Sequence, residues 1–170
     1  MSNIHAKVRL HRETNSFLQF SDEKLFAGRT KCYLIFKRSI DIFFSFLVLL
    51  FVFPWLFPVI ILLIKFTSKG PAFFTQKRVG YRDNVFVCIK FRTMYVNNFA
   101  DTRQAEPDDP RITRVGKFLR KSGMDELPQF INILTGDMSI IGPRPFMLND
   151  YNHFVTIIPN YAFRNLVRPG

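Results

Sequence analysis

The sequence predicts an α+β fold in which an apolar, proline-containing segment precedes a small basic domain. Three observations predict it. An uncharged run extends from Ile42 to Ile64, the second of two later segments around a turn alternates as a strand does, and an apolar stripe with helical spacing follows them. The chain has 170 residues. This length predicts one ordinary domain and argues against a polytopic membrane enzyme.

The composition narrows the classes of function. The net charge is +11, yet 48% of the residues are hydrophobic and 21 are Phe, which argues against a disordered basic tail because such tails lack residues for a core. Basic and apolar character together predict an anionic partner: phospholipid, nucleic acid or a phosphorylated metabolite. Cys32 and Cys88 form neither a zinc signature nor a disulfide framework. Histidines occur only as His5, His11 and His153, which excludes a histidine general base in the middle of the chain.

The apolar run defines a membrane segment, residues 37–66, behind a polar leader, residues 1–36, in which no motif is recognised. The run meets the roughly 20 residues of a spanning helix. Pro54 near its middle, with Pro58 one turn later, predicts a sharp bend, because proline removes a helical hydrogen bond. A crossing helix carries a cation bias towards its cytoplasmic end, but here cations flank both ends. These cations are Lys31, Lys37, Arg38, Lys65 and Lys69. Pattern alone therefore leaves a re-entrant helix and a single crossing helix both open.

Two strands are predicted after this segment, at residues 72–79 and 84–94, joined by a turn at residues 80–83. The second strand alternates two sets of side chains and so has two distinct faces. Lys90 and Arg92 share one of these faces, and taken alone they are interpreted as two solvated cations. Residues 97–111 are predicted to form a surface loop.

Two helices are predicted next. The first is short and basic, spans residues 113–121 and is closed by Ser122 and Gly123. The second ends at Gly136, and Pro128 locates its start, because proline is tolerated in the first turn of a helix. Its apolar stripe consists of Leu127, Phe130, Ile131 and Leu134. Asp125 and Glu126 therefore lie at the N-terminus of the second helix.

This placement indicates a phosphate ligand. Unpaired amides and the helix dipole favour anions at a helix N-terminus. The cations Arg120, Lys121 and Arg144 would offset the repulsion between a phosphate and the two carboxylates. Mg²⁺ would do the same, since it commonly binds one or two carboxylates together with substrate phosphates.

Two structural interpretations compete with this chemistry. Ser122-x-x-Asp125 resembles a capping box, in which the acidic side chain only stabilises a helix end. Pro143-Arg144-Pro145 resembles a rigid extended connector whose arginine points at water. Neither motif decides the question by itself.

Taken together, the motifs resemble those of the monotopic phosphoglycosyl transferases, the bacterial sugar transferases that load sugar phosphates onto polyprenyl phosphate. The resemblance covers most of the chain from residue 37 onwards, in order and with family-like spacing. The motifs that carry it are Lys37-Arg38-Ser39-Ile40-Asp41, Ser68-Lys69-Gly70-Pro71-Ala72-Phe73-Phe74-Thr75-Gln76-Lys77-Arg78-Val79-Gly80, Lys90-Phe91-Arg92-Thr93-Met94, Asp109-Pro110-Arg111-Ile112-Thr113-Arg114-Val115-Gly116, Met124-Asp125-Glu126-Leu127-Pro128-Gln129, Asn132, Gly136-Asp137-Met138-Ser139, Gly142-Pro143-Arg144-Pro145 and Val167-Arg168-Pro169-Gly170.

The resemblance implies a mechanism. In the family, the Asp of an Asp-Glu pair, here Asp125, attacks the β-phosphate of a UDP-sugar, releases UMP and carries the sugar phosphate until polyprenyl (undecaprenyl) phosphate accepts it. The adjacent Glu, here Glu126, is linked to the Mg²⁺ site and to proton handling. Mg²⁺ is therefore the implied cofactor, with Asp125 and Glu126 as its candidate ligands. The phosphate-binding cations of the family match Lys90, Arg120 and Arg144. A carboxylate nucleophile needs no histidine, which agrees with the composition.

The resemblance also implies an architecture and partners. The protein is expected to be a monotopic membrane protein with a re-entrant helix bent at Pro54 and a small cytoplasmic α/β domain, residues 67–170, at the cytoplasmic face of the bacterial inner membrane. Family members usually continue past the Arg168-Pro169-Gly170 motif, so the C-terminal part of the family domain is expected to be missing. The implied partners are a UDP-sugar, polyprenyl phosphate and the bilayer, without nucleic acid; a homo-oligomer is left open. The product would initiate a surface glycan, such as an exopolysaccharide or lipopolysaccharide.

Two other hypotheses stay open. A non-catalytic basic membrane anchor would bind anionic lipid or nucleic acid through its charge, although residues 65–170 contain no recognisable nucleic-acid module. A catalytically dead paralogue would serve as the partner of an active homologue, but the presence of all five matching polar residues argues against it. These residues are Lys90, Arg120, Asp125, Glu126 and Arg144.

Overall fold

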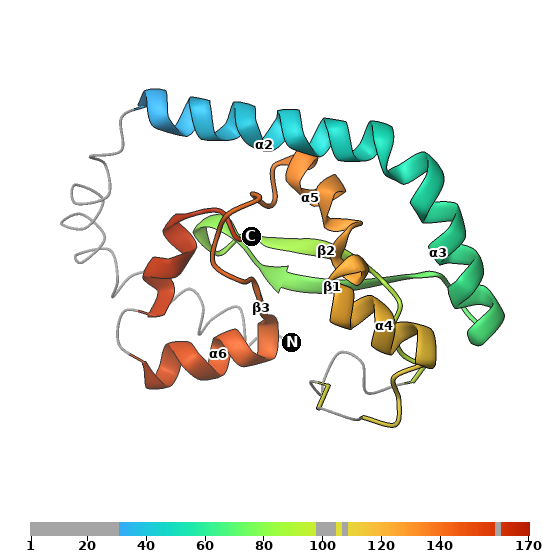
Figure 1. Cartoon of the computed structure of the whole chain (residues 1–170). Helices are drawn as coiled ribbons and strands as arrows, with labels where there is room; N and C mark the ends of the chain where they lie inside the picture. Colours follow the sequence, from blue (N-terminus) through green and yellow to red (C-terminus); the bar gives the residue numbers. More distant parts are fainter. Residues whose placement is uncertain (1–30, 98–104, 107–108, 159–160) are drawn as a thin grey trace. The chain divides into compact units, whose positions relative to one another are not determined.

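A computed structural model of the chain describes residues 31–97, 105–106, 109–158 and 161–170 (Figure 1). Residues 1–30 of the predicted leader, together with parts of the predicted 97–111 loop that include Pro107 and Asp108, lie outside the described residues. The chain divides into two compact units, residues 1–39 and residues 40–170. The second unit holds all the predicted site residues.

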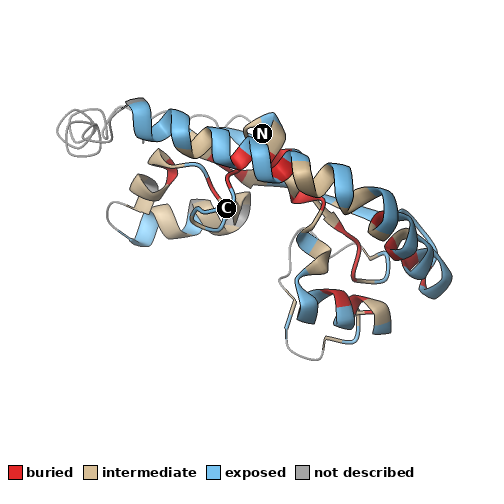
Figure 2. Ribbon diagram, turned by 45° about the horizontal axis from the view of Figure 1, so that its top comes forward, coloured by how far each residue is buried: buried red, intermediate tan, exposed pale blue. Residues whose placement is uncertain are grey.

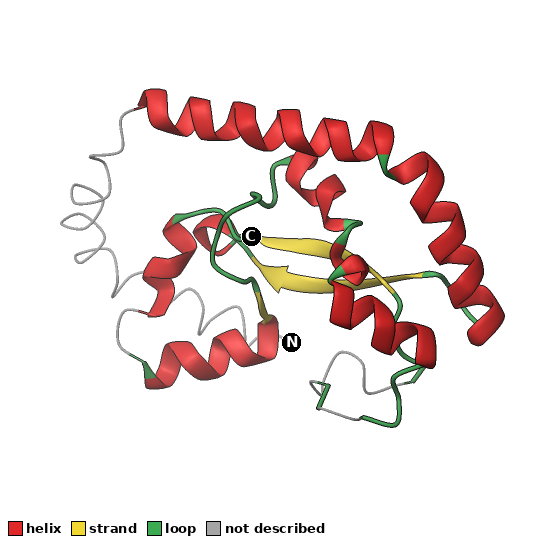
Figure 3. Cartoon of the chain, viewed as in Figure 1, coloured by secondary structure: helices red, strands yellow, loops and turns green. Residues whose placement is uncertain are grey.

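A three-stranded antiparallel sheet forms the centre of this unit (Figure 3). It consists of β1 (Phe73–Val79), β2 (Val85–Phe91) and β3 (Phe146–Met147) in the order β2-β1-β3. Strands β1 and β2 are the two predicted strands, joined by the short turn η1 (Tyr81–Asp83). The combination of this sheet with helices confirms the predicted α+β class.

Cross-strand pairing decides which side chains share a face of the sheet. Gln76 pairs with Cys88 and Arg78 pairs with Phe86, so these four residues and Lys90 lie on one face. The opposite face is apolar at one end, where the ring of Phe73 stacks on that of Phe91 with 5.3 Å between the centroids. The face with Lys90 carries Gln76 and Arg78 as well, whereas Thr75 and Lys77 lie on the opposite face.

Two apolar helices precede the sheet, α2 (Lys31–Phe51) and α3 (Phe53–Thr67). They meet at an angle of 64°. Val52 lies between them, and Pro54 occupies the first turn of α3. Proline is tolerated in that turn because the N–H groups of a first turn have no acceptor within the helix, so no hydrogen bond is lost. Among the described residues, neither helix alone has the length and apolar content to cross a bilayer, although the bent pair has enough of both.

Helix α3 packs against the sheet through one side only (Figure 2). Phe57, Ile60 and Ile64 form its buried side, and they share a core with Phe91 of β2. Fully burying side chains of this size contributes about 1.5–3 kcal/mol each, so α3 is firmly joined to the sheet. Helix α3 and the sheet belong to one compact unit.

Two helices and a short turn connect the sheet to the site: α4 (Arg114–Ser122), η2 (Met124–Glu126) and α5 (Gln129–Thr135). Thr113 caps α4, because its side chain accepts a hydrogen bond from the Gly116 amide at 2.9 Å. Helix α5 is held on β2, the edge strand of the sheet, by Asn132. The side chain of Asn132 accepts a hydrogen bond from the Ile89 amide at 3.1 Å and donates one to the Val87 carbonyl at 2.8 Å.

The C-terminal part forms elements that no periodic pattern of residues predicted. These are β3, α6 (Leu148–Ile157) and the 3₁₀ segment η3 (Tyr161–Leu166). Asp83 in the β1–β2 turn accepts hydrogen bonds from the Tyr151 hydroxyl at 2.6 Å and from Asn165 at 2.7 Å. One carboxylate therefore joins α6 and η3 to the hairpin.

Candidate active site

The carboxylate pair lies at the junction between α4 and α5. Gly123 ends α4 in the left-handed conformation with φ 71°, which glycine adopts without steric cost. The chain then forms η2, in which Met124 packs against the core, as does Leu127 directly after it. Asp125 and Glu126 lie between these two anchors. Core packing on either side thus fixes the position of the pair.

Glu126 binds two of the predicted cations. The Lys90 ammonium donates a hydrogen bond to Glu126 Oε1 at 2.5 Å, and Arg144 Nη2 lies 3.9 Å from the same oxygen. Burial alone would raise the pKa of Glu126, but the hydrogen bond and charge of Lys90, with the charges of Arg144 and Arg78, outweigh burial and lower this pKa. Glu126 is therefore held as an anion among cations.

Asp125 has a different environment. Partial burial raises the pKa of its carboxyl group, and the charge of Glu126 acts in the same direction, whereas the charges of Lys90 and Arg120 oppose them. No hydrogen bond or ion pair joins this carboxylate to another side chain in the described part of the chain. A pKa displaced by burial and by named charges is typical of functional carboxylates.

A small cavity of about 190 Å³ lies beside Glu126. Three cations line it: Arg78 of β1, Lys90 of β2, and Arg144, which precedes β3. The other lining residues are Cys88, Glu126, Gln129, Gly142, Pro145 and Gly170. The cavity therefore offers a strongly cationic surface to an anion, next to the carboxylate pair.

The structure brings some predicted residues together and places others apart. Lys90, Glu126 and Arg144 meet at the cavity. Arg120 is not among its lining residues, because its guanidinium Nε donates to Thr93 Oγ1 at 2.7 Å, although its charge still acts on Asp125. Pro54 belongs to the helix break and not to the cavity.

Two structural interpretations are wrong in detail. The predicted capping box does not form, because the Ser122 hydroxyl donates back to the carbonyl oxygens of Phe118 and Leu119, and Pro128 is the N-cap residue of α5. Lys90 and Arg92 are not two solvated cations. Lys90 binds Glu126, and Arg92 is 6% exposed with its guanidinium donating to the Ser68 and Lys69 carbonyls.

The prediction that residues 143–145 form a connector applies to their backbone. The segment leads directly into β3, and the Arg144 side chain is 76% exposed, yet its guanidinium reaches towards Glu126. An arginine side chain with this exposure is accessible to an anionic ligand.

Sequence reasoning missed Arg78 and Gln129 as lining residues. A signal for Arg78 was present, because Arg78 alternates with Lys77 along the first strand and pairs with Phe86, which places it on the face of Lys90. Gln129 has no comparable signal. It is 9% exposed, and only the packing of α5 against β2 directs it to the cavity.

The donor set suits magnesium better than a transition metal. No group of three or more His, Cys, Asp or Glu side chains exists among the described residues that could hold a metal alone. Mg²⁺ commonly binds through one or two carboxylates plus substrate phosphates and water, and Asp125 and Glu126 supply two adjacent carboxylates. The residues present therefore fit this ion.

Comparison with known proteins gives consistent matches. The family model described as "Bacterial sugar transferase" matches residues 32–170. A UDP-glucose:undecaprenyl-phosphate glucose-1-phosphate transferase of Klebsiella pneumoniae is 44% identical over 138 residues, covering 81% of this chain and 30% of that protein. An N-acetylgalactosaminephosphotransferase of Aeromonas hydrophila, which uses UDP-N-acetylgalactosamine and undecaprenyl phosphate by its name, is 43% identical over 81% of this chain and 33% of its own length.

A shorter relative is covered more fully. The exopolysaccharide production protein PSS of Rhizobium leguminosarum bv. phaseoli is 39% identical over 142 residues, covering 81% of this chain and 70% of that protein. The chain thus spans about a third of the first two relatives and most of this one.

Proposed function

Because this chain belongs to the bacterial sugar transferase family, as its motifs predicted, we propose that it transfers a sugar 1-phosphate from a UDP-sugar to polyprenyl phosphate. The names of the first two relatives support this proposal, since both are undecaprenyl-phosphate sugar phosphotransferases. The proposed product is a polyprenyl diphosphate sugar, the starting point of a surface glycan.

The proposal rests most directly on one arrangement: Glu126, one carboxylate of the pair, lines a cavity together with three cations, and Asp125 directly precedes it in the chain. A diphosphate needs several cations to offset its charge, and Arg78, Lys90 and Arg144 supply them from three separate strands or strand ends. A basic anchor that only binds lipid would require neither the cavity nor the adjacent carboxylates.

The proposed reaction has two steps. In the first, an Asp125 carboxylate oxygen forms a bond to the β-phosphorus of the UDP-sugar, and the bond from that phosphorus to the bridging oxygen breaks, so that UMP leaves with the electron pair. In the second, a phosphate oxygen of polyprenyl phosphate attacks the same phosphorus and releases the Asp125 carboxylate. Lys90 and Arg144 stabilise the charge on the transferring phosphoryl oxygens throughout.

Mg²⁺ is proposed as the cofactor of this reaction. Asp125 and Glu126 would hold it, and when bound it supplies positive charge to the diphosphate. The Lys90 hydrogen bond keeps Glu126 ionised, which is the form that binds a metal.

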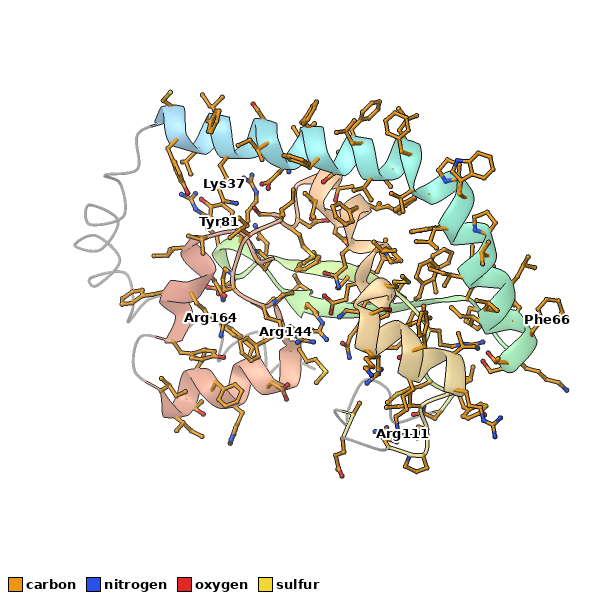
Figure 4. All side chains as sticks on the ribbon, viewed as in Figure 1. Lys37, Phe66, Tyr81, Arg111, Arg144 and Arg164 are labelled. Carbon is orange, nitrogen blue, oxygen red and sulfur yellow. The ribbon has the colours of Figure 1, made fainter. Side chains whose placement is uncertain are left out.

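Exposed apolar side chains support a position at a bilayer. Trp55 is 79% exposed and Phe66 is 85% exposed, and Phe66 points away from the sheet (Figure 4). An apolar surface of this kind is typical of membrane contact. Since the opposite side of α3 packs on β2, a bilayer around α3 would hold the sheet close to the headgroups, where a lipid-borne phosphate lies. We propose a re-entrant α2–α3 pair at the cytoplasmic face of the inner membrane.

The decisive experiment measures UMP release by the purified full chain in nanodiscs with Mg²⁺, polyprenyl phosphate and a panel of UDP-sugars that includes UDP-glucose and UDP-N-acetylgalactosamine. Asp125→Asn is expected to lower the rate by at least about a thousandfold, because it removes the nucleophile. EDTA is expected to stop the release and added Mg²⁺ to restore it. Without the lipid acceptor, mass spectrometry should detect a phosphosugar adduct on Asp125.

Asp137→Asn is the matched control. Asp137 lies just beyond the end of α5 and accepts a hydrogen bond from Thr135 at 2.8 Å, away from the cavity. This variant should keep the rate of the unmodified chain. Equal UMP release by Asp125→Asn and the unmodified chain would rule out the covalent mechanism.

A further inference from the structure

The segment Gly142–Pro145 carries Arg144, whose side chain is long and 76% exposed. In the described part of the chain its guanidinium approaches one carboxylate, that of Glu126 at 3.9 Å, a distance too long to fix the direction of the guanidinium. The position of the Arg144 backbone therefore decides which part of the site this side chain can reach. Pro143 and Pro145 have no N–H group, so this segment can be held mainly through its carbonyl oxygens.

Two other arginines bind those carbonyl oxygens. Arg164 Nη2 donates to the Arg144 carbonyl at 2.9 Å, and Arg78 Nη1 donates to the Pro145 carbonyl at 2.6 Å. Arg164 comes from η3 and Arg78 from β1, so the contacts reach the segment from two separate elements. Figure 4 shows Arg144 and Arg164 near each other. A hydrogen bond from a charged donor is among the stronger ones that a carbonyl can accept.

Arg164 is itself held in place. Its guanidinium carbon lies 4.1 Å from the centre of the Phe146 ring and 5.3 Å from that of Tyr161, and its Nη1 donates to the Tyr161 hydroxyl at 3.1 Å. Phe146 belongs to β3, the strand that follows Arg144 directly. Arg164 thus binds the strand and the preceding carbonyl at once, without lining the cavity.

We propose that Arg164 is a positioning residue for Arg144: by holding the Arg144 carbonyl it directs the Arg144 guanidinium towards the cavity, and Arg78 holds the next carbonyl in the same way. The proposal deepens the proposed function, because it assigns a cause to the placement of one anion-binding side chain. It rests on that function only for the identity of the anion.

A double-mutant cycle tests the coupling. The probe is inorganic pyrophosphate, titrated calorimetrically into the full chain in nanodiscs with EDTA present, so that the protein's cations alone hold the anion. Arg164→Ala and Arg144→Ala are each expected to weaken binding by about tenfold, and the double variant should be no weaker than Arg144→Ala. Arg164→Lys keeps a positive charge near the Phe146 ring but replaces the two donor nitrogens, Nη1 and Nη2, by a single one, so its loss of pyrophosphate affinity should be intermediate.

The control is Arg82→Ala. Arg82 also lies over an aromatic ring, that of Tyr81 at 5.2 Å, and it belongs to the exposed β1–β2 turn, not to the cavity. This variant should keep pyrophosphate affinity within about twofold, and its effect should add to that of Arg144→Ala.

Three results would overturn the proposal: additive losses for Arg164→Ala and Arg144→Ala, an Arg164 effect no larger than that of Arg82, or no pyrophosphate binding by the unmodified chain. Failure of the proposed function can be told apart from failure of this proposal. In that case the chain would release no UMP, but the pyrophosphate cycle would still show coupling between Arg164 and Arg144. If Arg164→Ala does not fold, Arg164→Lys in both backgrounds carries the same comparison.

Discussion

Lys90 and Arg92 illustrate how little a residue's charge says about its role. They are two residues apart at the end of β2, yet Lys90 reaches Glu126 across the cavity while Arg92 is buried against the end of α3. Arg92 donates hydrogen bonds to the carbonyl oxygens of Ser68 and Lys69, at the end of α3, where carbonyl groups lack partners within the helix. Lys90 holds a carboxylate in its ionised form. The partner each side chain meets, which is set by packing, decides between a structural and a functional cation.

Tyr151 gives a prediction at the same scale. Burial raises the pKa of Tyr151, and its hydrogen bond to Asp83 acts in the same direction. Because the folded state favours the neutral phenol, this contribution to stability is complete below about pH 10, the ordinary value, and is lost as the pH rises further. Tyr151→Phe should lower the free energy of unfolding by about 1 kcal/mol at neutral pH, and the difference should shrink above pH 10.

Urea denaturation between pH 7 and pH 11 measures this difference. Tyr95→Phe is the control, since Tyr95 is 50% exposed and its removal should leave stability nearly unchanged at every pH. A gap between Tyr151→Phe and the unmodified chain that stays constant up to pH 11 would contradict the assigned role of the phenol.

At the scale of elements, the break between α2 and α3 has a local cause and a non-local stabiliser. Pro54 removes one helical hydrogen bond and disfavours a helical conformation in Phe53, so the helix is weakened there in any context. The 64° angle is then supported by packing, because Phe53 stacks on Phe57 with 3.5 Å between ring centres. Phe57 in turn contacts Phe91 in the sheet.

The proposed re-entrant topology predicts a labelling result. Cys32, which is exposed, precedes the bend, and Lys69, also exposed, follows it. If the pair enters and returns, a membrane-impermeant maleimide should label Cys32 and a Lys69→Cys variant (with Cys32→Ser) from the cytoplasmic face in inverted vesicles. Neither should react in intact spheroplasts.

The second cysteine of the chain serves as the internal control in that experiment. Cys88 is 1% exposed and should stay unlabelled in a Cys32→Ser background. Labelling of positions 32 and 69 from opposite faces would show a crossing segment and exclude the re-entrant one.

At the scale of the whole second unit, one segment of the site is held from two sides. On one side, the buried Asp41 of α2 accepts hydrogen bonds from the Ser139 hydroxyl at 2.8 Å and the Ile140 amide at 3.1 Å. On the other, Pro169 and Gly170 bond to Ser139 and Pro143. Helix α2 and residues 169–170 thus both contribute to the placement of the loop that carries Arg144.

A substitution at Gly142 tests whether the last residues hold this loop. A Cβ at Gly142 would meet the backbone of Arg168 and Gly170, which cannot rotate away as a side chain would. Gly142→Ala should therefore destabilise the protein by about 1–3 kcal/mol and separate the 168–170 segment from the loop. Hydrogen exchange should speed up at the Ser139 amide, which donates to the Pro169 carbonyl at 2.8 Å.

Gly123→Ala provides the comparison. A Cβ there meets nothing within 4 Å, so only the left-handed backbone is penalised, at about 1–2 kcal/mol. Exchange at Ser139 should not change. If both variants speed exchange at Ser139 equally, the close approach of the two segments does not hold the loop.

The sequence by itself determined the features that depend on neighbours in the chain. The turn at residues 80–83 and alternation in the second segment predicted the two long strands, the apolar stripe and Pro128 predicted α5, and Pro54 predicted the position of the bend. The order and spacing of the motifs were also sufficient to identify the family. Each of these signals is read within a few residues, because backbone periodicity and proline sterics act locally.

Only the tertiary structure decided which side chains meet. Lys90 and Glu126 are 36 residues apart in sequence, and Arg164 and Arg144 are 20 apart. Arg78 and Gln129 reach the cavity through strand pairing and through the packing of α5. Contacts between distant residues depend on the three-dimensional arrangement of the elements, which no local pattern specifies. For that reason the sequence supplied the cations and carboxylates of the site, while the fold selected their partners.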